Sequence, residues 1–264
     1  MRASQTYLLI SSIFMMGAVL TVPMMFPAGF APTRAQAQVA QDRMPQMPGK
    51  PGPELPQSGN YLAGDTIRFR LDKYREYERL RFAGNDEIYY LSIEPAALGG
   101  RVLKYDTGDV ALQVAGWGGV TIYTVEHPGG VPAERLGDAA PLADFAAAPD
   151  AKTLAQRLSE EIQSRTGLTI GFRANWEALN QSDLTRALAT DAIRNATLSI
   201  ERVATTRRIG QQLFTQFSIV RIATANDPGV AIGDRLLTIQ IATSRGFAGR
   251  PSTVAITKAI RDRL

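Results

Sequence analysis

Three short stretches decide the fold that this sequence predicts: TIRFRL (66–71), RLRFAGND (79–86) and EIYYLSI (87–93). In each of them apolar residues occupy every second position, as Phe69 and Leu71 do between arginines. A period of two places the apolar side chains on one face of a β-strand. The Gly-Asn-Asp at the end of the second stretch is typical of a turn. We therefore predict consecutive antiparallel strands joined by tight turns.

The same pattern continues to about residue 125. Segments 101–105, 110–115 and 120–125 resume it, and turns that contain glycine separate them. Short strands at roughly ten-residue spacing are typical of an antiparallel meander. The sequence predicts about six strands within residues 60–137, forming a small barrel or a strongly curved sheet.

Helical periodicity begins after residue 150. Asp150 can cap a first helix, and Gly167 stands where a left-handed C-terminal cap is expected. The apolar face of this helix consists of Leu154, Leu158 and Ile162. A second helix is predicted from Ser182 or Asp183 to about Val203. Its apolar stripe consists of Leu184, Leu188, Ala192 and Ala196.

Short strands complete the second half. We predict strands at 168–172 and 252–257, and a hairpin over 230–242 whose two-residue turn is Gly233-Asp234. Segment 208–222 fits a helix or, from Phe217 onward, the start of a strand. The predicted fold class is α+β: an antiparallel β-meander followed by helices with a small antiparallel sheet.

Residues 1–37 have the pattern of a signal peptide. Arg2 precedes an apolar run over 7–30, and Ala35-Gln36-Ala37 gives the small residues that a signal peptidase reads. We expect cleavage after Ala37, with a cut after Ala31 as the second possibility, and a periplasmic or secreted mature protein. No membrane span is expected after cleavage. The alternative is a retained anchor, since Leu8 to Phe26 approaches the roughly 20 residues that cross a bilayer. Two late prolines favour cleavage.

The mature chain is predicted to have four parts. Residues 38–59 form a disordered tail rich in Pro, Gln and Met. Residues 60–137 form the β-meander module, 138–150 a linker, and 151–264 the α+β module.

Composition excludes several function classes. Removing 37 of 264 residues leaves 227, and loss of Arg2 and Arg34 lowers the net charge from +4 to +2. The charges are interspersed without a basic patch, so nucleic acid is not an expected partner. Because the chain has one histidine and no cysteine, it cannot form a lipid-modified cysteine or a His/Cys metal site.

Two groups of polar residues near turns are candidate sites. His127 stands before Pro-Gly-Gly, and no G-x-S-x-G elbow accompanies it, so we interpret it as a surface or turn residue. Asp106 and Asp109 flank Gly108 and could share a calcium ion. We favour a tight turn, because the spacing of a calcium loop is missing.

Two further groups lie in the second half. Glu177, Asp183 and Asp191 could supply an acid pair for glycoside hydrolysis, but a solvated helix edge explains them as well. The segment Gly246 to Ser252 (GFAGRPS) could hold an anion through glycine amides and Arg250. We favour a structural loop with Arg250 paired internally.

Aromatic residues are concentrated in the β-meander. Alternate ones are expected to point inward and fill the core. Trp117, placed among glycines, is the best candidate for an exposed anchor. The other members of this set are Tyr61, Tyr89, Tyr90, Tyr105 and Tyr123.

Three segments resemble an uncharacterised family of exported alphaproteobacterial proteins that is defined as a domain of unknown function. These are Phe82 to Leu91, Tyr105 to Thr124, and Gly233 to Ser252, which together carry mostly turn motifs. The resemblance extends over about residues 59–256. It implies an exported protein of two halves, and it brings no catalytic residue to carry over.

No residue is assigned a catalytic, cofactor-binding or metal-binding role. The expected function is a non-catalytic binding or envelope-associated module with an unidentified envelope partner or ligand. One alternative is a cofactor-independent hydrolase of an envelope polymer, which requires Glu177, Asp183 and Asp191 to line one cleft. The other is a small-ligand binder that uses the barrel interior.

Overall fold

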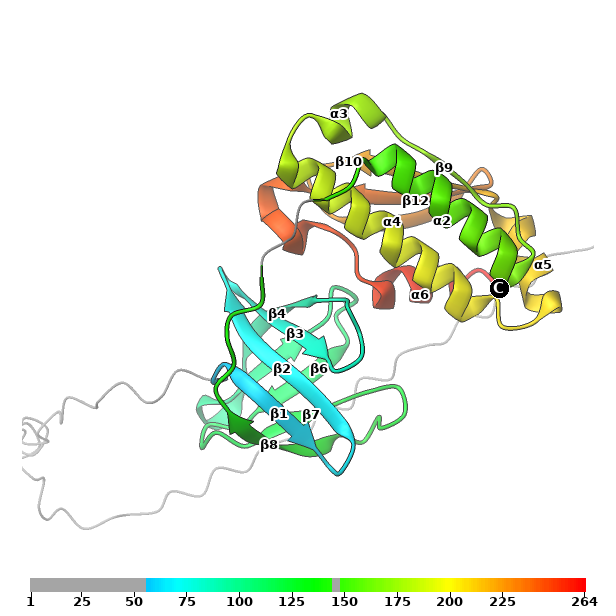
Figure 1. The fold of residues 1–264 in the computed structure, drawn as a ribbon. Coiled ribbons are helices and arrows are strands. Elements are labelled where there is room, and N and C mark those ends of the chain that lie inside the picture. Colours follow the sequence, from blue (N-terminus) through cyan, green and yellow to red (C-terminus); the bar gives the residue numbers. More distant parts are fainter. Residues whose placement is uncertain (1–55, 144–147) are drawn as a thin grey trace, which may run out of the picture. The chain divides into compact units, whose positions relative to one another are not determined.

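The structure is a computed structural model that describes residues 56–143 and 148–264, which belong to one compact unit. The predicted signal peptide (1–37), the predicted tail up to residue 55 and linker residues 144–147 lie outside the described residues. Figure 1 shows a β-barrel followed in sequence by helices packed on a small sheet. No helix in the described part of the chain is both long and apolar enough to cross a membrane.

In residues 56–143 as described, eight antiparallel strands form a closed barrel in sequence order, and the last strand pairs with the first. The prediction of a meander is confirmed, and the sheet is closed rather than open. The strands are β1 (Gly59–Ala63), β2 (Ile67–Tyr74), β3 (Tyr77–Phe82), β4 (Tyr89–Pro95), β5 (Arg101–Lys104), β6 (Val110–Val114), β7 (Val120–Ile122) and β8 (Val131–Gly137), with a short 3-10 turn η1 (Ala97–Gly99) before β5.

The strand count exceeds the predicted six because β1 and β8 were missed. Segment β8 contains a proline and two charged residues, and its side chains are at most half buried, so it lacks a clear apolar alternation. These two strands pair with each other, with Leu62 opposite Glu134 and Ala63 opposite Ala133. The missed strands are therefore the ones that close the barrel.

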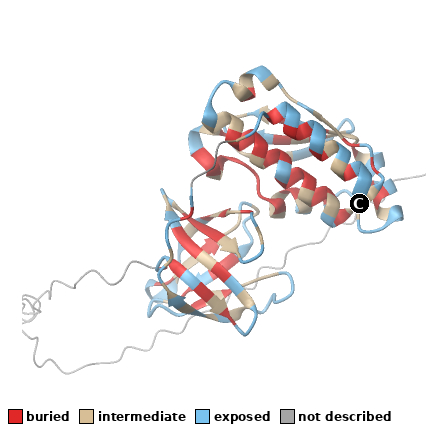
Figure 2. Ribbon diagram, in the orientation of Figure 1, coloured by how far each residue is buried: buried red, intermediate tan, exposed pale blue. Residues whose placement is uncertain are grey.

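The interior of the barrel is filled by side chains. Inward-facing aliphatic residues from successive strands are fully buried, and the Tyr61 and Phe69 rings stack with centroids 5.2 Å apart. The buried positions follow the strands in Figure 2. This packing fills the middle of the barrel, so any space for a ligand lies toward the barrel ends. The fully buried aliphatic residues are Leu71, Leu80, Leu91, Leu103, Leu112 and Ile122.

Residues 148–264 as described form helices on a four-stranded sheet. The two predicted long helices are confirmed with their caps: Asp150 Oδ1 accepts a hydrogen bond from Thr153 N (2.8 Å), and Ser182 Oγ accepts one from Thr185 N (3.1 Å). The elements are α2 (Ala151–Thr166), β9 (Gly171–Arg173), α3 (Trp176–Asn180), α4 (Asp183–Val203), α5 (Arg207–Gln216), β10 (Ile219–Thr224), β11 (Gly229–Gly233), β12 (Leu236–Ile241), η2 (Thr243–Gly249) and α6 (Thr253–Arg261).

The small sheet is mixed, so the prediction of an antiparallel sheet is wrong. Its order is β11-β12-β10-β9, and β10 runs parallel to both β12 and β9. Three helices between β9 and β10 supply the crossover that parallel strands need. Only β11 and β12 form the predicted hairpin, and its turn lies one residue later than predicted. Asp234 and Arg235 both have positive φ, as a two-residue turn of this kind requires.

Segment 208–222 had two possible structures in the prediction, and segment 252–257 was predicted as a strand. Segment 208–222 contains both proposed structures, because α5 ends at Gln216 and β10 starts at Ile219. The predicted strand at 252–257 is wrong, since it begins α6. Ser252 Oγ accepts hydrogen bonds from Val254 N and Ala255 N, and this cap favours the helix over the short alternation.

Candidate functional site

Asp106 and Asp109 have separate hydrogen-bond partners. Asp106 accepts hydrogen bonds from Ser252 N and Ser252 Oγ, each at 2.7 Å, whereas Asp109 accepts one from Thr107 Oγ1 at 2.8 Å. Gly108 between them has φ of 83°, as the predicted tight turn requires. Among the residues that the structure describes, no group of three or more His, Cys, Asp or Glu side chains could hold a metal ion.

The three carboxylates of the hydrolase hypothesis do not converge. Asp183 pairs with Arg186, and Asp191 Oδ2 accepts a hydrogen bond from Arg250 Nε at 2.6 Å. Eight residues of α4 separate these aspartates, which corresponds to a rise of about 12 Å. This exceeds the roughly 5–9.5 Å between the carboxyl groups of glycosidases. Glu177 lies in the first turn of α3, and none of the three lines any of the four pockets described in the structure.

The GFAGRPS segment is a structural loop with Arg250 paired internally, as expected. Arg250 is buried, and besides Asp191 it binds the carbonyl oxygen of Ile88 through Nη2 at 2.8 Å. Its guanidinium carbon lies 5.5 Å from the centre of the Tyr90 ring. With Nε and Nη2 engaged by these groups, Arg250 is a packing residue that contacts the barrel.

His127 and Trp117 occupy turns of the barrel. His127 is exposed in the loop between β7 and β8, which agrees with its interpretation as a surface residue. Trp117 is 83% exposed in the turn between β6 and β7, which agrees with its predicted exposure. Of the other aromatic residues named from the sequence, Tyr61 and Tyr89 are buried, and Tyr90, Tyr105 and Tyr123 are partly buried.

One end of the barrel carries a pocket that the sequence did not reveal, here called the aromatic pocket. It has a volume of about 900 Å³, and four aromatic rings line it: Phe82, Tyr89, Tyr105 and Tyr123. Tyr89 packs edge-on against Phe82 (6.0 Å between centroids) and against Tyr105 (5.4 Å). The pocket takes its rings from the ends of β3, β4, β5 and β7, which the barrel brings together.

The rim of the aromatic pocket is polar and carries both signs of charge. Arg202 from the end of α4 donates to Thr253 Oγ1 at 2.8 Å, and Asp109, Glu126 and His127 lie on the barrel side. Hydrogen bonds from its own backbone N–H and from Thr124 lower the pKa of Glu126, so this carboxylate is ionised. Burial raises the pKa of Tyr105, which keeps its hydroxyl neutral.

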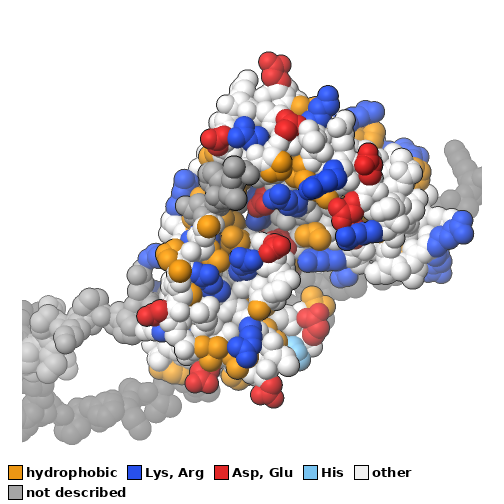
Figure 3. Space-filling model, viewed as in Figure 1, with side chains coloured by type: hydrophobic (Ala, Val, Ile, Leu, Met, Phe, Trp, Pro, Cys, Tyr) orange, Lys and Arg blue, Asp and Glu red, His pale blue; other side chains and the backbone are white. Residues whose placement is uncertain are grey.

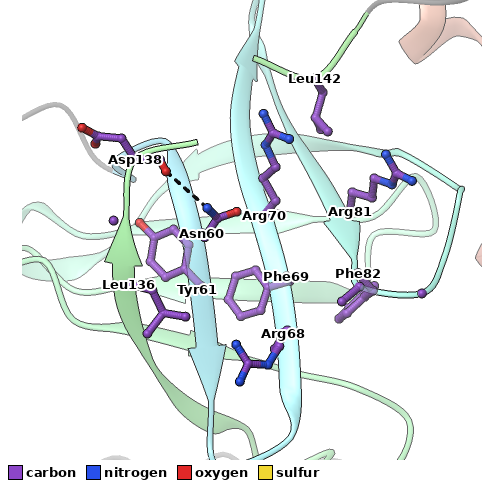
Figure 4. Close-up of a pocket in the computed structure, with 13 residues that line it drawn as sticks. Asn60, Tyr61, Arg68, Phe69, Arg70, Arg81, Phe82, Leu136, Asp138 and Leu142 are labelled. Atoms are coloured by element: carbon purple, nitrogen blue, oxygen red, sulfur yellow. Dashed lines mark hydrogen bonds between the residues drawn. The ribbon is translucent and has the colours of Figure 1, made fainter. Parts of the chain in front are cut away.

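A second pocket, here called the arginine groove, lies on the outer wall of the barrel. Its volume is about 460 Å³. Figure 4 shows Arg68 and Arg70 on β2, Arg81 on β3 and Leu142 beside them. The Leu142 side chain is buried although it belongs to the predicted linker, and its N–H donates to Asp72 Oδ2 at 2.7 Å. Residues 138–143 thus pack against the barrel.

The profile of a domain of unknown function, DUF4908, matches residues 40–260. The chain belongs to the DUF4908 family. This confirms the resemblance seen over residues 59–256 as membership in a family of unknown function. No curated protein and no solved structure matches the chain. The DUF4908 assignment brings no activity and no site residue, so the function of this member is argued from its own pockets.

The surface of this DUF4908 protein shows no large region of one charge in the view of Figure 3, where Lys and Arg side chains are interspersed with Asp and Glu. Many of the arginines have acidic partners, for example Arg245 with Asp227 and Arg165 with Glu161. A binding site on this protein is therefore defined by local shape and chemistry rather than by a long-range field.

Proposed function

We propose that this protein is an exported, non-catalytic binding module of the cell envelope whose ligand occupies the aromatic pocket. The sequence pattern of residues 1–37, with its basic start, apolar run and Ala-Gln-Ala exit, supports export to the periplasm or beyond. The aromatic pocket is the observation that carries the binding function.

The size and lining of the pocket suit a small molecule. Ligand pockets commonly measure about 300–1,000 Å³ and combine apolar walls with few polar groups. Here Ile67 and Val254 add aliphatic surface to the four rings, so most of the exposed lining is apolar. Aromatic rings bury a large area and favour flat or ring-containing ligands that can stack or pack against their edges.

The polar groups of the aromatic pocket limit the chemical class of ligand that it can bind. The Tyr105 and Tyr89 hydroxyls are neutral, and burial raises the pKa of both further, so they act as hydrogen-bond donors and acceptors rather than as anions. The rim offers Arg202 on one side and the ionised Glu126 on the other. We propose a largely apolar, ring-containing ligand that is neutral or zwitterionic overall.

The geometry gives no support to covalent catalysis in this pocket. A catalytic triad requires a histidine hydrogen-bonded to a nucleophile. In the described residues the His127 imidazole has no such serine partner, and its loop contacts are those of a turn closed by Thr124. Binding is therefore the function that the pocket supports best.

A fluorescence titration with the apolar probe N-phenyl-1-naphthylamine tests the proposal on the purified mature chain. Val125 and Leu98 are matched loop residues, 86% and 88% exposed, but only Val125 lines the pocket. We expect Val125→Asp to weaken probe binding by about threefold or more and Leu98→Asp to leave it unchanged.

Equal loss in both variants, or no rise in emission with the wild-type chain, would overturn the proposal. Because both residues are solvent-exposed, neither change threatens the core. A circular dichroism melt of each variant verifies that the fold is retained.

A further inference from the structure

Neighbouring strands of the barrel place a row of polar residues side by side in the arginine groove. Asn60 on β1 lies opposite Arg70 on β2, and Arg70 lies opposite Arg81 on β3. Side chains at such directly opposed positions are about 5 Å apart at Cβ. Arg68 is two residues before Arg70 on the same strand and therefore on the same face.

The adjacent row of the same two strands contains a cross-strand ion pair, whereas this one does not. Asp72 lies opposite Arg79, and the two form a buried ion pair. In the row of Arg70 and Arg81, two like charges stand directly opposite each other, an arrangement that destabilises a sheet. Neither arginine of this pair thus has an acidic partner at the opposed position of the other strand.

Arg70 in particular has donors without acceptors. Its Nε and Nη2 atoms are buried, and within the described part of the chain neither has a hydrogen-bond partner. Leaving a buried donor unsatisfied costs roughly 1–3 kcal/mol, and more for a charged group. Such an orphan needs an explanation, and a small movement of the guanidinium toward an anion in the groove would supply the missing acceptors.

The remaining charges of the groove are already engaged. Arg81 Nη2 pairs at 2.8 Å with Asp86, which is fully exposed, and exposed pairs of this kind contribute little. The one acidic side chain among the described lining residues, Asp138, pairs with Arg135. Arg68, Arg70 and Arg81 therefore line the groove. The only carboxylate among its described lining residues is already paired with a fourth arginine.

We propose that the arginine groove binds a phosphate group, held between Arg70 and Arg81 with Arg68 at the edge. A guanidinium fork matches two oxygens of phosphate, and a compact multivalent anion relieves the repulsion between opposed arginines better than a single carboxylate does. Asn60 can add a donor, although its Nδ2 donates to Asp138 O at 3.2 Å here. Leu142 and Leu136 supply apolar wall for the rest of the ligand.

Calorimetric titration with inorganic pyrophosphate tests the site on the purified chain. The key variant is Arg70→Gln, and the matched control is Arg101→Gln, which removes the same charge from another strand of the barrel. We expect Arg70→Gln to weaken binding by about tenfold or more and Arg101→Gln to change it less than twofold. Loss of an orphaned buried charge should leave the melting temperature of Arg70→Gln unchanged or raised, so a loss of binding is not a loss of folding.

Sedimentation with vesicles that contain phosphatidylglycerol, compared with phosphatidylcholine alone, distinguishes two sources of the phosphate. If the wild-type chain sediments with the phosphatidylglycerol vesicles and Arg70→Gln does not, the ligand of the groove is a lipid head group. Pyrophosphate binding without retention assigns the groove to a soluble phosphorylated molecule. Absence of both, or equal losses in the Arg70 and Arg101 variants, overturns the inference.

Discussion

The Asp106 carboxylate accepts two hydrogen bonds from Ser252, the residue that caps α6, although 146 positions separate them in the sequence. Ser252 Oγ in turn accepts from the first amides of the helix. A second barrel carboxylate, Glu87, accepts from Thr253 N at 2.8 Å and from Thr253 Oγ1 at 2.5 Å. Negative charge is favourable at a helix N-terminus, so the barrel loops stabilise the start of α6.

Replacing Glu87 by glutamine should destabilise the protein by about 1–3 kcal/mol. The change keeps the size of a buried side chain but replaces an acceptor of two hydrogen bonds by an amide that has donors of its own. Urea unfolding followed by circular dichroism measures the difference. Glu94→Gln is the control, because Glu94 pairs with Lys104 on the surface, and it should cost less than about 0.5 kcal/mol.

Asp106→Asn and Ser252→Ala should show strong coupling in a double-mutant cycle. Both remove parts of one network at the start of α6, so the double variant should lose less stability than the sum of the single ones. We expect a coupling energy of about 0.5–3 kcal/mol from unfolding experiments. Additive losses would mean that the two residues stabilise the fold independently.

Stability should fall in the alkaline range as tyrosines ionise. Burial raises the pKa of Tyr105 and Tyr90 above the ordinary 10.0, so the folded state holds their protons longer than the unfolded state does. The contribution is fully present below the unfolded pKa, near 10, and is lost as the pH rises toward the folded pKa.

Absorbance at 295 nm during alkaline titration measures this effect. Tyr105→Phe should remove part of the late-titrating absorbance and leave the rest in place. If all the tyrosines ionised together in the folded protein, the prediction would fail.

Expression of the full chain in a Gram-negative host should yield a periplasmic product that starts at Gln38. Substituting Ala35 and Ala37 by glutamine should block processing, because a signal peptidase reads small side chains at these positions. N-terminal sequencing and osmotic-shock fractionation measure both results. A cytoplasmic product of full length would contradict export.

Local signals in the sequence were sufficient for those elements whose stability is local. The caps at Asp150 and Ser182 and the alternation around Phe69 predict their helix and strand correctly because the interacting groups lie within a few residues. The α6 cap was missed because Ser252 opens a segment whose short alternation also fits a strand. Strand β8 was missed because its burial is supplied by pairing with β1 rather than by its own composition.

The candidate sites depend on neighbours that the sequence does not place. Internal pairing of Arg250 was expected, but its partners Asp191 and Ile88 come from an α-helix and a barrel loop. The arginine groove requires the strand register that sets Arg70 opposite Arg81, and a shift of one residue would send these side chains to the other face. No short sequence motif predicts such a strand register.

The pairing of β1 with β8 also limits how another protein can bind the barrel. An open sheet offers a row of unpaired amides and carbonyls on which a partner can add its own strand. Throughout the barrel as described, every strand has a neighbour on each side, so a partner cannot extend the sheet with a strand of its own. A partner must therefore recognise the barrel through side chains and loop tips, where Leu98, Val125 and Trp117 are the most exposed large apolar residues.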